Sequence, residues 1–540
     1  MIMNLLDSTV ISVAAPAIRA DLAGTYAELQ WSAAAYTLAM AVGLLTGGRL
    51  GDMFGRRRMA LIGVAGFAAA SLACALAWSP QVLIAARIVQ GLFAAVMIPQ
   101  SFGLIRDLFP PQQAGQAFAA LGPVIGLSTI LGPVVAGLLI DADLFGTGWR
   151  MIFGINLPLA AFALIAGGRA LPTRPATARR SRLDLPGVVL GGAAMFMLVF
   201  PLMQGRELGW PTWSVAMLAG ATPVLAIFAW YQIRRTHAGH TPLVDLAVFA
   251  KRSYTSGVVF VIVFFGAIAG ITLAIGLFLQ LGLGFTPLGA SLAMSSWAIG
   301  SFAGSLVGST LTPRLGRRIL HVGLVVMAAG LAGVLVALSL AGIGLGGWDL
   351  AVPLLAFGAG MGMIFALLFE IILGDIDDHQ VGSASGILES LQQLGASLGV
   401  AIIATTFFGV IGAAALHNFD TAAAPRLRAE LTTAGVPATT REQIVTSLRT
   451  CVHDTENATT PDAVPASCRT ADRPATPAIT KAIAAAAVDT HKRDSLAAAR
   501  TATQLALALT ALAFAIGFFL PARPRRHSVP TTTTGASHGK

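Results

Sequence analysis

Apolar runs follow one another along almost the whole chain, and short polar segments separate them. Most runs are about 20 residues long, the length that a helix needs to cross a bilayer. One polar segment, 413–497, is much longer than the others and is rich in Ala, Thr, Pro and charge. The pattern predicts an all-α polytopic membrane protein with fourteen transmembrane helices, at roughly 1–20, 31–50, 59–78, 82–106, 117–140, 150–170, 186–204, 212–233, 254–280, 287–309, 319–342, 350–374, 383–412 and 498–520.

Composition agrees with this class and excludes several others. The 540 residues are 55% hydrophobic and 11% charged, whereas soluble domains are about 25% charged. The net charge of +10 comes from arginines in short loops, which gives no reason to expect nucleic acid as a partner. We find no zinc-protease, nucleotide-binding or nucleophile-elbow motif. We therefore expect no enzyme activity, no cofactor and no metal.

Basic residues are distributed unevenly between the two sets of loops. The loops after even-numbered runs, with the C-terminal tail, hold 21 Lys and Arg, and the short loops on the other side hold three. Cytoplasmic loops carry this excess by the positive-inside rule. The bias predicts a multi-pass protein of the cytoplasmic membrane with both termini in the cytoplasm and with segment 413–497 outside.

A short charged segment, 47–58, joins the second and third runs and contains a single acid among four arginines. One interpretation is a basic loop that only sets the topology. The segment also resembles the helix 2–3 signature of the major facilitator superfamily of secondary transporters. The resemblance implies a major facilitator fold and a conformational gate on the cytoplasmic side, closed in the outward-facing state, with matching residues Gly48, Asp52, Gly55, Arg56 and Arg57.

A second loop, 308–318, repeats part of this segment after the tenth run, with Pro313 where Asp52 stands in the first copy. Two six-helix halves with a two-helix insert would produce such a repeat. Repeated halves are common in transporters, and the substrate site lies at their interface. The expected division is an N-terminal half at 1–170, a linker and insert at 171–253, a C-terminal half at 254–520 that includes the loop 413–497, and a cytoplasmic tail at 521–540.

Two charged residues lie in apolar runs of the N-terminal half, where a charge is costly and suggests function. Asp7 opens a pattern that resembles the helix 1 signature of the 14-helix drug:proton antiporters, with Ser12 in place of Asn. Arg87 begins Arg-x-x-Gln-Gly, which is similar to the helix 4 signature. The resemblance implies that both residues act in proton coupling and that Asp7 lies toward the cytoplasmic side. The alternatives are a solvated acid at a frayed helix end and an arginine that only tethers helix 1.

The fifth run carries a motif of small residues around a proline, which lets helices pack closely. It resembles the antiporter signature of exporters, although Ile130 and Ala136 depart from it, and its matching residues are Gly126, Gly132, Pro133 and Gly137. Residues 149–158 and 183–187 also resemble this family. We interpret both of these segments as structural.

Glu389 lies in 382–399, which resembles the pattern of segment 13 in the 14-helix family, where some multidrug members carry an acid. A carboxyl removed from water favours its neutral form, so Glu389 could exchange a proton for a substrate. The alternative is a solvated, inert glutamate near the cytoplasmic mouth. Expected substrate contacts besides Glu389 are Gln393, Gln280, Trp297, Phe365 and Glu370.

The chain has three cysteines, and two of them, Cys451 and Cys468, share the long polar segment. A disulfide is expected there because the segment is predicted to lie on the oxidising side. Two free thiols in a mobile loop are the alternative.

These features together predict a monomeric, proton-coupled antiporter that exports a small amphipathic compound such as a drug or antibiotic. Its expected partners are protons, the small molecule and membrane lipids. Two alternatives stay open. One is a dedicated exporter of an endogenous metabolite, siderophore or lipid, and the other is a membrane sensor without transport.

Overall fold

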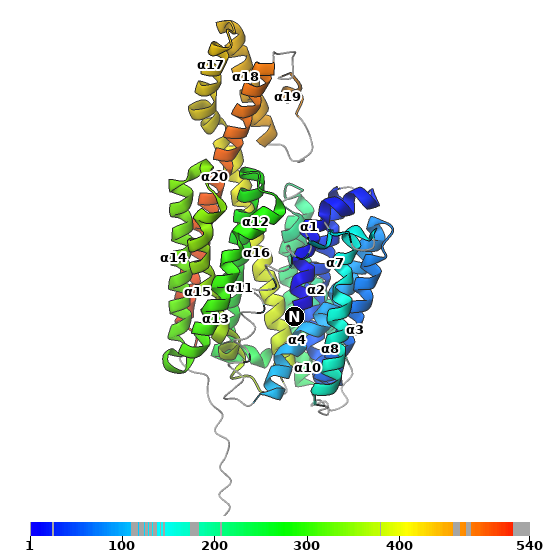
Figure 1. Ribbon diagram of the computed structural model, residues 1–540. Coiled ribbons are helices and arrows are strands. Elements are labelled where there is room, and N and C mark those ends of the chain that lie inside the picture. Colours follow the sequence, from blue (N-terminus) through cyan, green and yellow to red (C-terminus); the bar gives the residue numbers. More distant parts are fainter. Residues whose placement is uncertain are drawn as a thin grey trace, which may run out of the picture.

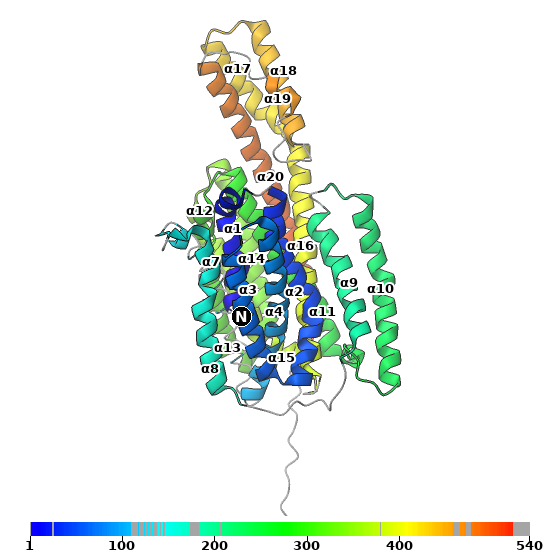
Figure 2. The same cartoon turned by 90° about the vertical axis from the view of Figure 1, so that its right-hand side faces the viewer.

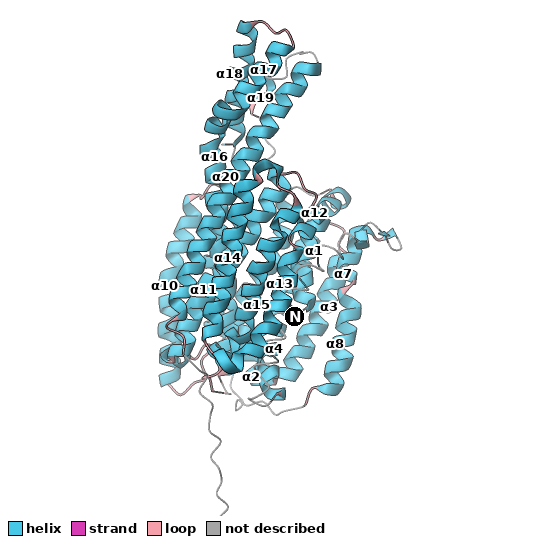
Figure 3. Cartoon of the chain, turned by 60° about the vertical axis from the view of Figure 1, so that its left-hand side comes forward, coloured by secondary structure: helices cyan, strands magenta, loops and turns pink. Residues whose placement is uncertain are grey.

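The computed structural model describes residues 2–23, 26–109, 146–172, 183–205, 208–377, 380–456, 465–470 and 477–521, with scattered positions between 117 and 143. Every regular element in these ranges is helical (Figure 3). The main helices are α1 Ile2–Leu22, α2 Tyr26–Phe54, α3 Arg56–Ala75, α4 Pro80–Leu108, α7 Met151–Gly154, α8 Asn156–Ala170, α9 Leu185–Gln204, α10 Thr212–His237, α11 Arg252–Leu277, α12 Pro287–Ala293, α13 Ser295–Leu315, α14 Arg318–Leu340, α15 Ala351–Leu373, α16 Val381–Asn418, α17 Ala424–Thr433, α18 Ala438–Glu456, α19 Ala466–Thr470 and α20 Pro477–Gly517.

Twelve helices among the described residues are long and apolar enough to cross a membrane. They coincide with twelve of the fourteen predicted runs. The first run forms α1, a helix of 21 residues, and the fifth run lies mostly outside the described residues. The prediction of an all-α polytopic membrane protein is therefore confirmed. The count of fourteen spans stays a prediction.

The helices form two groups that stand side by side (Figure 1). We name α1–α4, α7 and α8 the N-terminal group, and α11–α16 with α20 the C-terminal group. The pair α9 and α10, here named the insert pair, lies along one side of the bundle (Figure 2). The end of the bundle that carries α17–α19 is named the upper end, and the opposite end the lower end, as they are drawn in Figure 1.

Helices inside each group pack through small residues, as is usual where lipid removes the hydrophobic drive for association. In the C-terminal group, α13 crosses α15 at Gly304, where a Cβ atom would lie 2.0 Å from the carbonyl oxygen of Ala359. In the N-terminal group, α2 meets α4 at Gly47, with the carbonyl oxygen of Ala95 at the same distance. Such contacts require glycine because any side chain would separate the two backbones.

The described residues of segment 413–497 form a helical domain, so the polar connection expected between the last two runs is folded. Helix α16 has 38 residues and α20 has 41, which at 1.5 Å per residue gives roughly 60 Å each, about twice the thickness of the hydrocarbon core. Both helices therefore continue above the bundle, where α17 and α18 pack against them and α19 packs on α18 (Figure 1). This projecting domain has its own apolar core, composed of Ala415, Phe419, Ala423, Ala424, Leu427, Leu431, Val445, Leu448, Val452, Ala482 and Ala486.

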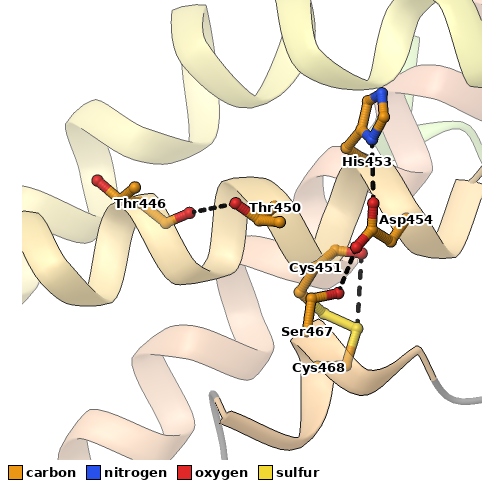
Figure 4. Close-up of a disulfide and its surroundings, with 7 residues drawn as sticks. All are labelled: Thr446, Thr450, Cys451, His453, Asp454, Ser467 and Cys468. Carbon is orange, nitrogen blue, oxygen red and sulfur yellow. Dashed lines mark hydrogen bonds and ion pairs between the residues drawn. A yellow bond between two sulfur atoms is a disulfide. The ribbon is translucent and has the colours of Figure 1, made fainter.

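A disulfide joins Cys451 of α18 to Cys468 of α19 (Figure 4). A second link runs parallel to it, because the Ser467 hydroxyl donates a hydrogen bond of 2.6 Å to the Asp454 carboxylate. Together these links hold the short helix α19 against the projecting domain. The third cysteine, Cys74, is buried in α3 and free.

Candidate functional site

Asp7 and Arg87 form an ion pair between α1 and α4, and both are 0% exposed. The Asp7 carboxylate also accepts hydrogen bonds from the side-chain amides of Gln90, at 2.8 Å, and Asn156, at 3.1 Å. Buried charges are stable when they are paired and their remaining hydrogen-bonding capacity is satisfied. Asp7 therefore lies in a polar network that connects α1, α4 and α8. We name these four residues the Asp7 network.

Arg87 is held on its other sides by α2 and by its own helix. Its Nε donates to the backbone carbonyl of Ser32 at 3.0 Å, and its Nη1 donates to the Gln90 side chain at 2.8 Å. The guanidinium carbon lies 4.2 Å from the centre of the Tyr36 ring, in a cation–π arrangement. The hydrogen-bond partners of Arg87 thus come from three helices, and Ser32 and Tyr36 carry no motif that would have identified them from the sequence.

One alternative for this region was wrong, and the expectation that Asp7 lies toward the cytoplasmic side stays a prediction. Asp7 is fully buried, so it is not a solvated acid at a frayed helix end. It also lies far from segment 47–58, because its partner Arg87 is in the second turn of α4 from the upper end, whereas segment 47–58 ends α2 at the lower end. The register of α1 is set by Asn4, which hydrogen-bonds the Tyr36 hydroxyl. Asn156, interpreted as structural from its motif, contributes directly to the Asp7 network.

Glu389 lies in the lower part of α16 and is 4% exposed, so it is not a solvated glutamate. It is three residues after Gly386 and shares a helix face with it. Gly386 lies against α2, where its Cβ would be 2.7 Å from the Leu44 carbonyl oxygen. Glu389 is thus placed at the seam between the two helix groups. Among the described residues, its Oε1 has no hydrogen-bond partner.

Asp52 of α2 connects the two helix groups at the same seam, closer to the lower end. Its carboxylate accepts a hydrogen bond of 3.2 Å from the backbone N–H of Ser383, in the first turn of α16. The positive end of the helix dipole favours an anion at this position. Arg56 and Arg49 flank the carboxylate at 3.5 and 3.9 Å. We name the contact between Asp52 and the first turn of α16 the latch.

The other residues of the 47–58 motif support the latch. Arg56 binds the end of α4 through Asp107, at 2.9 Å, and Arg57 donates to the Gly168 carbonyl at the end of α8. Gly55 has a φ of 92°, in the left-handed region that favours glycine, and it lets α3 start directly after α2. A Cβ on Gly48 would lie 2.3 Å from the Gly382 carbonyl oxygen, so the two groups meet here by backbone contact.

The lower end is closed by a second contact between the groups. Phe102 of α4 and Phe369 of α15 have ring centres 4.9 Å apart, and each is 1% exposed. At the corresponding loop of the C-terminal group, Arg317 donates to the backbone carbonyls of Phe518 and Leu520 at the end of α20. Arg317 therefore ties its loop to the last helix of its own group, much as Arg57 does. The repeated loop 308–318 thus has an arginine contact equivalent to that of Arg57. It has no second latch, because Pro313 stands where Asp52 stands in the first copy.

The structure does not gather the expected substrate contacts into one place. Gln280 is exposed, in the π-helical turn Phe278–Gly282 that continues α11, so its assignment to the cavity was wrong. Trp297 packs on Phe357 in the C-terminal group, and Phe365 packs on Phe264. Gln393 follows Glu389 by one turn and is half-buried, and Glu370 is half-buried at the lower end of α15. Only Gln393 shares the Glu389 face.

The structure describes little of the antiporter motif. Gly126, Pro133 and Gly137 lie outside the described residues. Gly132 is helical and buried. In the described part of the chain, no group of three or more His, Cys, Asp or Glu side chains could hold a metal ion.

The Major Facilitator Superfamily model matches residues 1–400 of the chain. A probable actinorhodin transporter of Streptomyces coelicolor is 43% identical over 97% of this chain and 90% of its own length. The tetracenomycin C resistance and export protein of Streptomyces glaucescens is 33% identical over 76% of this chain and 75% of its own length. The puromycin resistance protein of Streptomyces alboniger is 33% identical over 76% of this chain and 80% of its own length.

Solved structures support the fold alone, because their sequence identity is low. The human organic anion transporter MFSD10 superposes with a TM-score of 0.54 at 16% identity, over 75% of this chain and 92% of its own. The proton:xylose symporter XylE superposes with a TM-score of 0.51 at 17% identity, over 75% of this chain and 86% of its own. The family match and the relatives show that this chain is a membrane transporter, not an enzyme, and that it belongs to the Major Facilitator Superfamily.

Proposed function

We propose that this protein exports a small amphipathic compound, such as an antibiotic, across the cytoplasmic membrane in exchange for protons. The observation that carries the proton coupling is Glu389, a buried carboxyl at the seam between the helix groups whose Oε1 lacks a partner among the described residues. Export is supported by the relatives, which include a tetracenomycin C export protein and a puromycin resistance protein.

In this proposal the two helix groups rock against each other around the site at their interface. The lower end faces the cytoplasm, with both termini there, and the projecting domain lies outside. The closed latch then corresponds to the outward-facing state. Glu389 takes up a proton from outside and releases it to the cytoplasm, and the substrate moves in the opposite direction. The protein acts as a monomer surrounded by membrane lipids. Its domain boundaries are those expected from the sequence.

The Asp7 network is a second candidate for proton coupling. Its carboxylate already pairs with Arg87 and accepts hydrogen bonds from the side-chain amides of Gln90 and Asn156. We therefore assign the primary exchange to Glu389. A role for Asp7 and Arg87 in the conformational cycle follows from their position between α1, α2, α4 and α8.

The test is proton movement in energised everted vesicles, with a panel of cationic, neutral and acidic amphipathic antibiotics. At least one compound should dissipate the pH gradient with the wild type and none with Glu389→Gln. Glu430→Gln, the same change at an exposed glutamate of α17, is the matched control and should behave as the wild type. If Glu389→Gln responds like the control, Glu389 is not the coupling residue.

A dedicated exporter of one endogenous metabolite is the second candidate. The relative with 43% identity over nearly the whole chain, a probable actinorhodin transporter, favours it over broad drug export. The same panel separates the two, because a dedicated exporter responds to one chemical class and a multidrug exporter to several.

A further inference from the structure

The insert pair covers the seam that the latch closes. Val199 of α9 is fully buried against Leu38 and Ala41 of α2, and Leu394 of α16 packs on the same cluster. Helix α9 therefore contacts both helix groups along the line where they separate in a rocking motion. A pair of helices that contacted only lipid at the edge of the bundle would not contact both helix groups in this way (Figure 2).

The lower end of the insert pair is fixed by a buried acid. Asp184, 3% exposed, precedes α9 and accepts a hydrogen bond from the N–H of Gly187 at 3.1 Å. It also accepts from the Tyr231 hydroxyl and the Gln232 amide of α10, both at 2.9 Å. This carboxylate thus joins the start of α9 to the last turns of α10.

Gln232 extends this connection to the segment 238–251, here named the strap, which runs from α10 to α11. Gln232 is 0% exposed, and its Oε1 accepts from the backbone N–H groups of Leu243, at 2.9 Å, and Val244, at 3.4 Å. Both strap residues are buried in the main core. The Nε2 of Gln232 therefore donates to Asp184, and its Oε1 accepts from the strap.

The strap in turn holds the first turn of α16. The Ser383 hydroxyl donates to the Leu243 carbonyl at 3.4 Å, and the Gln380 amide donates to the Asp245 carboxylate at 2.5 Å. Lys251, at the other end of the strap, donates to the Asp375 carbonyl at 2.6 Å. Ser383 is the residue whose backbone N–H binds Asp52 in the latch. A continuous chain of contacts thus leads from the insert pair to the latch.

We propose that the insert pair and the strap position the first turn of α16 for the latch, and that Gln232 is the central positioning residue. This inference rests on the proposed rocking of the two helix groups. It implies that the insert pair travels with the C-terminal group and that its contact with α2 breaks when the lower end opens. Gln232 acts through the strap and does not contact substrate.

The test measures the opening of the lower end in the full-length protein in nanodiscs. Spin labels at Arg58 of α3 and Arg318 of α14, two exposed positions at the lower end of different groups, report the distance between the groups. Gln232→Met keeps the length of the side chain and removes both sets of hydrogen bonds. It should raise the fraction of the longer, open distance about 3- to 10-fold, as expected for the loss of the three hydrogen bonds of one buried amide.

Two further variants separate a positioning role from general damage. Thr236→Val, on the next turn of α10, removes only a hydrogen bond within the helix and should leave the distances unchanged. Ser383→Ala removes the hydroxyl that binds the strap but keeps the N–H that binds Asp52, and should open the lower end less than Gln232→Met does.

A double-mutant cycle with Asp52→Asn gives the decisive comparison. Because Gln232 acts through the latch, Gln232→Met should add little opening once Asp52 is replaced. Unchanged distances in Gln232→Met, or full additivity with Asp52→Asn, would overturn the proposal. The distances need neither substrate nor a proton gradient, so this result is independent of the vesicle experiment on Glu389.

Discussion

Asp7 and Glu389 are both buried in the helix bundle, and their surroundings are opposite. Asp7 meets Arg87, Gln90 and Asn156 within the N-terminal group. Glu389 lies at the seam between the groups, and its Oε1 has no partner in the part of the chain that the structure describes. A paired carboxylate holds helices together, because removal of its partner leaves a buried charge. An unpaired carboxyl is most stable when neutral, and it can take up and release a proton as its access to water changes.

The largest effect on transport is expected from Glu389→Gln. The amide keeps the size of the side chain and cannot exchange a proton. Export against a gradient should fall to the level of vesicles without the protein, while downhill exchange of substrate continues. Substrate flux measured with and without a proton gradient checks this. Uphill export at the rate of Glu430→Gln would contradict the assignment.

Arg87→Met should reveal the structural role of the Asp7 network. Removal of one partner from a buried ion pair costs about 3–5 kcal/mol, so the melting temperature should fall and transport should drop with it. Arg58→Met, at an exposed arginine of α3, is the control. In contrast to Arg87→Met, Glu389→Gln should leave the melting temperature nearly unchanged. Equal stability of Arg87→Met and the wild type would mean that the network does not hold α1 and α4 together.

Gly48→Ala tests the seam itself. The new methyl would lie 2.3 Å from the Gly382 carbonyl oxygen and must push α2 away from α16. Transport should fall by roughly 3- to 10-fold, the size expected for a loss of about 1 kcal/mol in the closed state. Gly409→Ala, at a position of α16 with no atom within 4 Å of the new methyl, should have no such effect. Similar transport in the two variants would show that close approach at Gly48 is not needed.

The smallest effect on transport is expected in the projecting domain. Replacement of both cysteines by alanine removes the link between α18 and α19 and should destabilise this domain by about 3 kcal/mol, the usual value for a loop of this size. Hydrogen exchange in residues 438–470 should accelerate, while transport stays at the wild-type level. A loss of transport would instead give the domain a part in the exit of substrate.

The sequence predicted the membrane-spanning helices and the buried charges well, because long apolar runs and rare charges are local signals. It could not predict which residues meet. Asp52 binds the backbone of Ser383, which is 331 residues away, and a backbone donor has no signature of its own. Pairing partners such as Ser32 and Tyr36 were missed for the same reason, since they belong to an otherwise ordinary helix.

The projecting domain shows a different limit of the sequence. Its core is built partly from alanines such as Ala415, Ala482 and Ala486, in helices α16 and α20. Small residues give a weak hydrophobic pattern, and the surrounding Thr and charged residues hide it further. Length and composition therefore suggested a loop, although the same residues repeat at helical spacing. Gln280 was misplaced because a polar residue in an apolar run does not reveal which way its side chain faces, and here that side chain is exposed.

The central claim is that Glu389 carries the exchanged proton while Asp7 stays paired with Arg87. The most direct measurement is the number of protons released into weakly buffered solution when the purified protein binds a substrate identified in the vesicle panel. The account predicts release of about one proton by the wild type and by Asp7→Asn, and none by Glu389→Gln. Undiminished release by Glu389→Gln, with loss of release in Asp7→Asn, would contradict it and move the coupling to the Asp7 network.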